Sequence, residues 1–170
     1  MAESGYSGQP VTCLVAQDQP ITKAQGDVTA DLLKRLGMNV DFAAIDWGTV
    51  GARRAVRTPP GQGGWQMLHT WITGADCLNP AVHVLIRASG DKAGFGWPDV
   101  PEVEAQVTAW FDAKTLDEEK AAVRRLNKAA FESVVYAPTG FFLQYQAWRK
   151  NVTGIVQGPL PFFWGVSKTV

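Results

Sequence analysis

The residues that could carry chemistry gather in one short stretch, HTWITGADCLNP at positions 69–80. Its one carboxylate, Asp76, lies among mostly apolar, small or neutral residues, and two interpretations are open. Either Asp76 or Asn79 could cap a helix that begins near Leu78, after a turn at Gly74. Alternatively, an ionised Asp76 could bind the ammonium group of a ligand.

The ligand interpretation follows from the position of this stretch. The run WQMLHTWI (65–72) predicts a strand with Trp71 and His69 on one side, and Asp76 comes just past its end. Ligands of open α/β sheets bind outside the carboxyl ends of the strands. The rings of Trp71 and Trp47 could line such a site and attract a ligand cation through a cation–π interaction of about 0.5–2 kcal/mol. The candidate ligand-binding residues are therefore Asp76, Trp71, Trp47 and His69.

Enzyme chemistry has little support in the sequence. No phosphate-binding G-x-x-x-x-G-K-[ST], G-x-G-x-x-G after a strand, G-x-S-x-G or H-E-x-x-H motif occurs. A nucleophile pair of His69 and Cys77 would need a third group to orient the base; the plain alternative is a strand histidine and a buried cysteine. His83 falls in AVHVLIR, which predicts a helix. We expect a protein that is not an enzyme and that has no catalytic residues, no metal site and no cofactor.

Composition narrows the class of partner. The 170 residues are enough for one domain with a sizeable core. Sixteen basic residues balance sixteen acidic ones, which argues against a nucleic-acid partner. No apolar run approaches the roughly 18 residues of a membrane span, and no signal peptide is predicted. The aromatic share of 11% indicates a binding surface.

The elements that must position these residues follow an α/β order. VTCLVA (11–16) predicts a strand buried on both faces. A helix starting from Asp18 or Thr22 should follow, and Gly37 should end it in the left-handed conformation. MNVDFAAI (38–45) predicts a second strand, so the crossover should be parallel and right-handed. The helix should bury one apolar stripe, composed of Val28, Leu32, Leu33 and Leu36.

The rest of the chain should be helical and then extended. We expect a helix at 47–57, a loop at 58–64 and two further helices that form a hairpin. Each of these two helices has a capping-box spacing, Asp99 with Glu102 and Thr115 with Glu118. From residue 134 the chain should return to extended structure, and it carries many aromatic residues: Phe141, Phe142, Tyr145, Trp148, Phe162, Phe163 and Trp164.

Several ordered motifs resemble a known family. They are WGTVGARR, GGWQMLHTWITGADCLNP, FGWPD followed by x-PEVEA, and YAPTGFFLQYQAWRKNVTGIVQGPLPFFWGVSK. Together they resemble the C-terminal part of the peptide/nickel (family 5) class of extracellular solute-binding proteins, the ligand receptors of bacterial ABC transporters. The resemblance extends from about Val11 to Lys168.

The resemblance implies a fold and a division of the chain. The fold class is α/β, a periplasmic-binding-protein type II-like lobe. It has a mixed sheet of about four to five strands flanked by helices, a C-terminal helical hairpin and an extended return segment. Residues 1–10 would be a tag or linker and 11–140 the second-lobe domain. Residues 141–170 would return toward a missing first lobe.

The resemblance also implies a function. Such a lobe captures peptides or other small, cationic solutes by hinge closure, and in peptide-binding members an acid in the loop that matches TGAD pairs with the α-amino group; here that acid is Asp76. Trp71 departs from the pattern, because it stands five residues before the acid. The implied partners are the ligand, the missing N-terminal lobe and the membrane permease subunits. The full-length protein would be periplasmic or held at the cell envelope, with its export signal in the absent part.

Two other functions remain open at this point. A stand-alone interaction domain would use the C-terminal aromatic residues as a protein-binding patch. An enzyme would use the Cys77 and His69 pair. The aromatic residues of the tail could instead pack in the core of this domain, or partly in that core and partly against the missing lobe.

Overall fold

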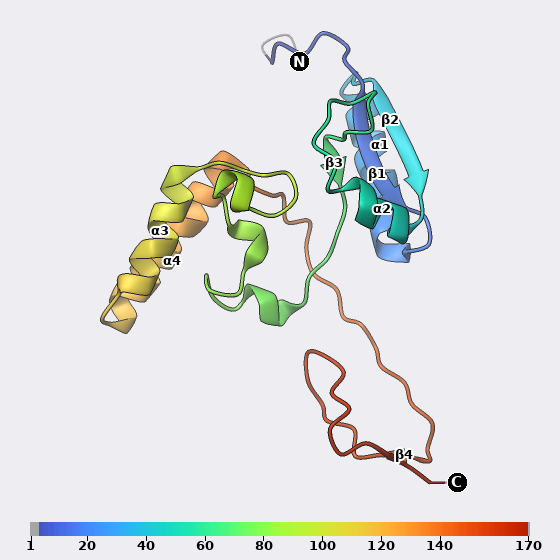
Figure 1. The fold of residues 1–170 in the computed structure, drawn as a ribbon, viewed down its shortest axis with the longest axis vertical. Coiled ribbons are helices and arrows are strands. Elements are labelled where there is room, and N and C mark those ends of the chain that lie inside the picture. Colours follow the sequence, from blue (N-terminus) through green and yellow to red (C-terminus); the bar gives the residue numbers. More distant parts are fainter. Residues whose placement is uncertain (1–3, 170) are drawn as a thin grey trace. The chain divides into compact units, whose positions relative to one another are not determined.

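The computed structural model describes residues 4–169 and divides the chain into two compact units (Figure 1). We call them the N-terminal unit (Met1–Trp71) and the C-terminal unit (Ile72–Val170). This division falls inside the domain predicted at 11–140. The assignment of 1–10 to a tag or linker and of 141–170 to a return segment stays a prediction.

The N-terminal unit is built on a parallel three-stranded sheet. β1 (Val11–Ala16) lies between β2 (Val40–Ile45) and β3 (Met67–Leu68). The central place of β1 follows from its apolar sequence, because both faces of that strand are covered and its last five residues are buried. α1 (Pro20–Arg35) connects β1 to β2, which confirms the predicted parallel crossover.

The buried face of α1 corrects the predicted stripe. The buried residues are the small Thr22, Gly26 and Ala30, whereas Val28, Leu32 and Leu36 are at least half exposed and Leu33 is half-buried. A Cβ added at Gly26 would lie 2.6 Å from Cγ2 of Val15, so the helix approaches β1 too closely for large side chains. Small size, rather than hydrophobicity, therefore selects the face that packs on the strand.

The ends of the elements in this unit also differ in part from expectation. α1 begins at Pro20 with Gln19 as its N-cap, and it ends before Gly37, whose φ of +83° is the predicted left-handed stop. α2 (Trp47–Arg53) is shorter than predicted. β3 has two residues instead of eight, because a strand exists only where a neighbour supplies ladder hydrogen bonds and β1 pairs with Met67 and Leu68 alone.

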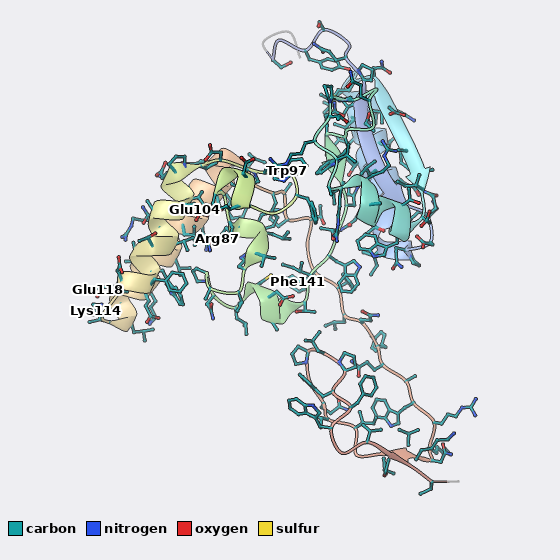
Figure 2. All side chains as sticks on the ribbon, viewed as in Figure 1. Arg87, Trp97, Glu104, Lys114, Glu118 and Phe141 are labelled. Carbon is teal, nitrogen blue, oxygen red and sulfur yellow. The ribbon has the colours of Figure 1, made fainter. Side chains whose placement is uncertain are left out.

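The C-terminal unit contains the predicted helical hairpin, α3 (Pro101–Asp112) and α4 (Leu116–Ser133). Thr115 caps α4, and the Glu118 carboxylate accepts from the backbone N–H groups of Lys114 and Thr115 at 2.7 and 3.1 Å (Figure 2). The capping box predicted at Asp99 is wrong. Val100 is the N-cap of α3 without a side-chain bond, because Pro101 already fixes the first helical residue.

The segment before α3 is irregular where a helix beginning near Leu78 and including His83 was predicted. It contains three 3-10 turns, η1 (Gly74–Cys77), η2 (Val84–Ile86) and η3 (Gly90–Lys92), and no α-helix begins near residue 78. Contacts with α3 hold it instead. The Glu104 carboxylate accepts from Nε of Arg87 at 3.0 Å and from the backbone N–H of Ala88 at 2.7 Å (Figure 2).

The core of this unit joins that segment to the hairpin. Ala88 and Ile86 pack with buried residues of both helices: Val103, Val107, Leu126, Ala129 and Ala130. Beyond α4 the chain runs as irregular structure to a short antiparallel pair, β4 (Val152–Thr153) with β5 (Ser167–Lys168). The α/β class is confirmed. Within residues 4–169, however, the strands form one parallel sheet of three and one antiparallel pair rather than a single mixed sheet.

Within the described residues, no helix has the length and apolar character that a membrane crossing would require.

Candidate ligand-binding site

Asp76 sits in η1 and is half-buried. Its Oδ2 accepts two hydrogen bonds from Thr73, one from the hydroxyl at 2.8 Å and one from the backbone N–H at 3.3 Å. The acid is therefore the third residue of a capping box with Thr73 around its own 3-10 turn, and the predicted role as cap of a helix beginning near Leu78 is wrong, because no helix begins there. Both hydrogen bonds reach Oδ2, so neither of them occupies Oδ1. The carboxylate is held in one orientation and can still accept from a ligand donor.

A cavity of about 600 Å³ lies beside η1 in the same unit. Cys77 and His83 line it from the irregular segment, and Trp110, Lys120 and Arg124 line it from the two helices. Asp76 is not among its lining residues. The cavity therefore lies within the C-terminal unit, and the Asp76 carboxylate does not line it.

His83 does not lie in a helix, contrary to expectation. It is the residue before η2, and its Nε2 lies 3.2 Å from the hydroxyl of Tyr136, with the two rings edge-on. Burial lowers the pKa of His83 and raises that of Tyr136. The pair is therefore a neutral hydrogen bond that ties the irregular segment to the chain beyond α4.

Trp47 opens α2 directly after the carboxyl end of β2. Its backbone N–H donates to Oδ1 of Asp18 at 2.8 Å, and its ring packs partly on the core around Leu14 and Val50. Asp46 caps the same helix, accepting from the N–H of Thr49 at 2.9 Å. Hydrogen bonds from Thr49 lower the pKa of Asp46, so this carboxylate is ionised at neutral pH.

Sequence reasoning did not select Asp18 or Asp46 as site residues. Asp46 follows β2 directly and Asp18 comes two residues after β1, so both acids lie at the carboxyl edge of the parallel sheet. That edge is where α/β sheets bind ligands. The signal was present in the sequence, since each acid comes after a run that predicts a strand.

His69 is buried at the end of β3. Its Nε2 lies 2.9 Å from Oγ1 of Thr29 on α1, and its exposed fraction is 9%. Nδ1 has no hydrogen-bond partner among the described residues. Burial lowers the pKa of His69, so the ring is neutral at pH 7. These contacts fit a histidine that fastens α1 to the sheet.

The four predicted site residues do not all belong to one unit. Trp47, His69 and Trp71 are in the N-terminal unit, where Trp71 is 42% exposed, and Asp76 is in the C-terminal unit. Each is therefore described within its own unit, and their role in ligand binding stays a prediction.

A Cys77 and His69 pair gains no support from this geometry. His69 is buried beside Thr29, and Cys77 is an exposed residue of η1 in the other unit. Within residues 4–169 no group of three or more His, Cys, Asp or Glu side chains is arranged to hold a metal ion.

Comparisons with known proteins bear on the whole chain. No family model matches it. Over 166 residues it is 32% identical to a probable peptide ABC transporter periplasmic-binding protein of Sinorhizobium fredii, a match that covers 98% of this chain and 31% of that protein.

A solved structure shares the fold. The crystal structure of a dipeptide-binding protein from Pseudoalteromonas sp. SM9913, in complex with Met-Leu, superposes with a TM-score of 0.71 at 17% identity. The superposition covers 98% of this chain and 34% of the other. This chain spans about a third of the length of both proteins, and both are described as binding proteins rather than enzymes. Over 98% of its length the chain is thus similar to part of a periplasmic-binding protein of a peptide ABC transporter, and it shares the fold of part of a dipeptide-binding protein.

Proposed function

We propose that this chain is the ligand-binding lobe of a periplasmic receptor that captures peptides or other small cationic solutes for an ABC transporter. The sequence match to a peptide transporter's binding protein supports the class of function, and the fold of the dipeptide-binding protein agrees with it. The permease subunits of that transporter and the remainder of the receptor are its proposed partners.

The observation that carries this proposal is the orientation of Asp76. Thr73 occupies Oδ2 and leaves Oδ1 open, so the carboxylate is fixed before a ligand arrives. A preorganised acceptor loses little side-chain freedom on binding. A half-buried carboxylate also attracts an ammonium group more strongly than an exposed one, because less water screens the pair. Asp76 is therefore the proposed anchor for the α-amino group of a peptide.

The other proposed contacts are weaker. Trp71 is partly exposed and could present an aromatic face to the ligand, and Trp47 is a second candidate for the wall. His69 would act only indirectly, since it is buried. Closure would follow from ligand contacts that are made only when the full-length protein is closed, because a ligand shifts a conformational equilibrium only by its differential affinity.

The test compares two ligands on two proteins. In the full-length receptor, Asp76→Asn should weaken binding of a dipeptide by about 2–5 kcal/mol, the range for truncating one partner of a buried charge pair. Asn keeps an acceptor for Thr73, so the turn should persist. The N-acetylated dipeptide lacks the ammonium group and should bind both proteins equally and weakly. Titration calorimetry gives all four dissociation constants.

Thr73→Val supplies the matched control, because it removes the hydroxyl that orients Asp76 and keeps the charge. It should weaken dipeptide binding less than Asp76→Asn does. If the N-acetylated and free dipeptides bind the unaltered receptor equally well, Asp76 is only a cap.

A further inference from the structure

The proposed function does not use the cavity of about 600 Å³ in the C-terminal unit. This cavity lies between the irregular segment before α3 and the helical hairpin, whose two helices stand side by side in Figure 1. Ligand sites in proteins have volumes of about 300–1,000 Å³ and combine apolar walls with a few polar groups. A cavity of this size is therefore large enough for a small organic molecule.

The inner wall of the cavity is apolar. Ile86 and Leu126 line it and are 4% and 1% exposed, so they form its floor. Trp110 of α3 lines the cavity as well, and its ring meets that of Phe111 edge to face, with 5.1 Å between the centroids. Indole rings bind other aromatic rings by offset stacking or by edge contacts. The wall is therefore suited to an apolar ligand body that contains an aromatic ring.

The outer part of the cavity carries positive charge. Lys120 and Arg124 line it from α4, where their spacing of four residues places both on one face of the helix. Both residues are exposed, and among residues 4–169 neither lies within ion-pair distance of a carboxylate. Two like charges at this spacing repel each other and destabilise a helix. A bound anion would relieve that repulsion.

The acid and the histidine that line the cavity leave its net charge positive. Glu119 supplies the one carboxylate among the lining residues. It lies on the helix face of the buried Leu126, seven residues later, rather than in the row of the two cations. His83 adds no charge at pH 7, because burial lowers its pKa. Two cations and one acid therefore favour an anionic ligand.

We propose that this cavity is a second ligand site and that it binds a small aromatic carboxylate. The ring of the ligand would pack against Trp110 above the apolar floor. Its carboxylate would accept hydrogen bonds from Nζ of Lys120 and from the guanidinium of Arg124, a group that pairs with carboxylates through two parallel bonds. Asp76, the proposed anchor for a peptide, does not line the cavity. The second site therefore goes beyond the proposed function and does not depend on it.

Titration calorimetry on the full-length receptor at pH 7 tests the site with three compounds of similar shape. Naphthylacetate should bind about tenfold or more tightly than the uncharged naphthylethanol, because only the acid makes charge-assisted hydrogen bonds. The cation naphthylethylamine should bind more weakly than either, because the net charge of the cavity repels it. Equal affinity for the acid and the alcohol, tightest binding of the amine, or no binding of the acid would overturn the proposal.

Variants of α4 test the role of the two cations. Lys120→Gln and Arg124→Gln should each remove most of the preference for naphthylacetate over naphthylethanol. Lys128→Gln is the matched control, because Lys128 lies on the same helix but does not line the cavity, and it pairs with Glu132 at 3.8 Å. It should leave both affinities unchanged. An equal loss in Lys128→Gln would contradict the proposal, since the charge of the helix as a whole would then attract the acid.

The thiol of Cys77 reports where the ligand binds, because it is exposed and lines the cavity. Saturating naphthylacetate should slow the alkylation of Cys77 by iodoacetamide, measured by mass spectrometry, and an unchanged rate would place the ligand elsewhere. A saturating dipeptide should leave the affinity for naphthylacetate unchanged. Competition between the two would overturn the proposal, because the cavity would then be part of the peptide site. Asp76→Asn should weaken binding of the dipeptide alone, so failure of the anchor and failure of the second site are distinguishable.

Discussion

The two units bury their apolar residues by different means. The N-terminal unit is organised around β1, whose residues from Cys13 to Ala16 are at most 1% exposed, and the helix on it approaches through small side chains. The C-terminal unit is organised around two helices that follow each other in sequence and meet through a stripe that includes Val107 and Leu126. The first core joins residues distant in sequence, and the second is largely local. Interactions between distant residues should thus set the stability of the first unit, whereas local helix signals should contribute more to the second.

The largest expected effect comes from one leucine in each core. Leu14→Ala and Leu126→Ala should each reduce stability by about 2–5 kcal/mol, because each side chain is fully buried and its loss leaves a cavity. Segment-resolved hydrogen exchange should show the loss in the unit that carries the substitution. If Leu126→Ala accelerates amide exchange in β1 as much as in α4, the two units unfold together and the comparison fails.

A smaller effect should distinguish two helical glycines of the N-terminal unit. Gly26→Ala should destabilise this unit by about 1–3 kcal/mol, because the new methyl group would overlap Val15. Gly51→Ala in α2 meets nothing within 4 Å and should stabilise by about 0.4–1 kcal/mol. Urea unfolding of both variants gives the sign. Stabilisation by Gly26→Ala would show that close approach does not determine how α1 packs.

The cap of α4 tests how far local signals support the C-terminal unit. Thr115→Ala removes the side chain that accepts from the N–H of Glu118 and should cost about 0.5–2 kcal/mol. Thr115→Ser keeps the hydroxyl oxygen and should cost less. Helical circular dichroism during thermal unfolding reports both. An equal loss for Ala and Ser would mean that the hydroxyl bond contributes nothing.

The smallest effect concerns pH. Hydrogen bonds from Arg87 and from the backbone N–H of Ala88 lower the pKa of Glu104, and the charge of Arg87 lowers it further. Burial acts in the opposite direction. The contribution of this carboxylate to stability is complete above the pKa of the unfolded state, near 4.5. It is lost as the pH falls through the lower pKa of the folded state. Glu104→Gln should remove this part of the acid dependence at a cost of about 0.2–1 kcal/mol at pH 7, because Arg87 is 39% exposed. Urea midpoints between pH 7 and pH 3 measure it, and an unchanged acid slope would contradict the assignment.

The local signals in the sequence were reliable where a helix could form from its own residues. The capping box at Thr115, the left-handed Gly37 and the hairpin of α3 with α4 were all predicted. The strands β1 and β2 were also predicted, β1 from a continuous apolar run and β2 from an alternation of apolar with polar residues. The choice of Asp76 as a candidate anchor came from its isolation in the sequence and from the family resemblance.

The errors arose where a partner distant in sequence decides the structure. The stripe predicted for α1 was chosen by hydrophobicity. Close contact with β1 requires a small residue, and so the helix buries Gly26 instead. The helix predicted around His83 is an irregular segment held by Tyr136 and by Glu104. The alternative that all the tail aromatics pack in this domain's own core is wrong, since Phe141 and Trp164 are largely exposed.

The sequence by itself determined the α/β class, the succession of β1, α1, β2 and α2, and the hairpin of α3 with α4, and it selected Asp76 as a candidate ligand anchor. These depend on apolar periodicity, capping residues and motif spacing, which are properties of neighbouring residues. The tertiary structure decided which face of α1 is buried, how Thr73 orients Asp76, and that the segment from Gly74 to Lys92 forms 3-10 turns instead of a helix. These outcomes depend on close packing and on hydrogen-bond geometry in three dimensions, which hydrophobic periodicity does not encode.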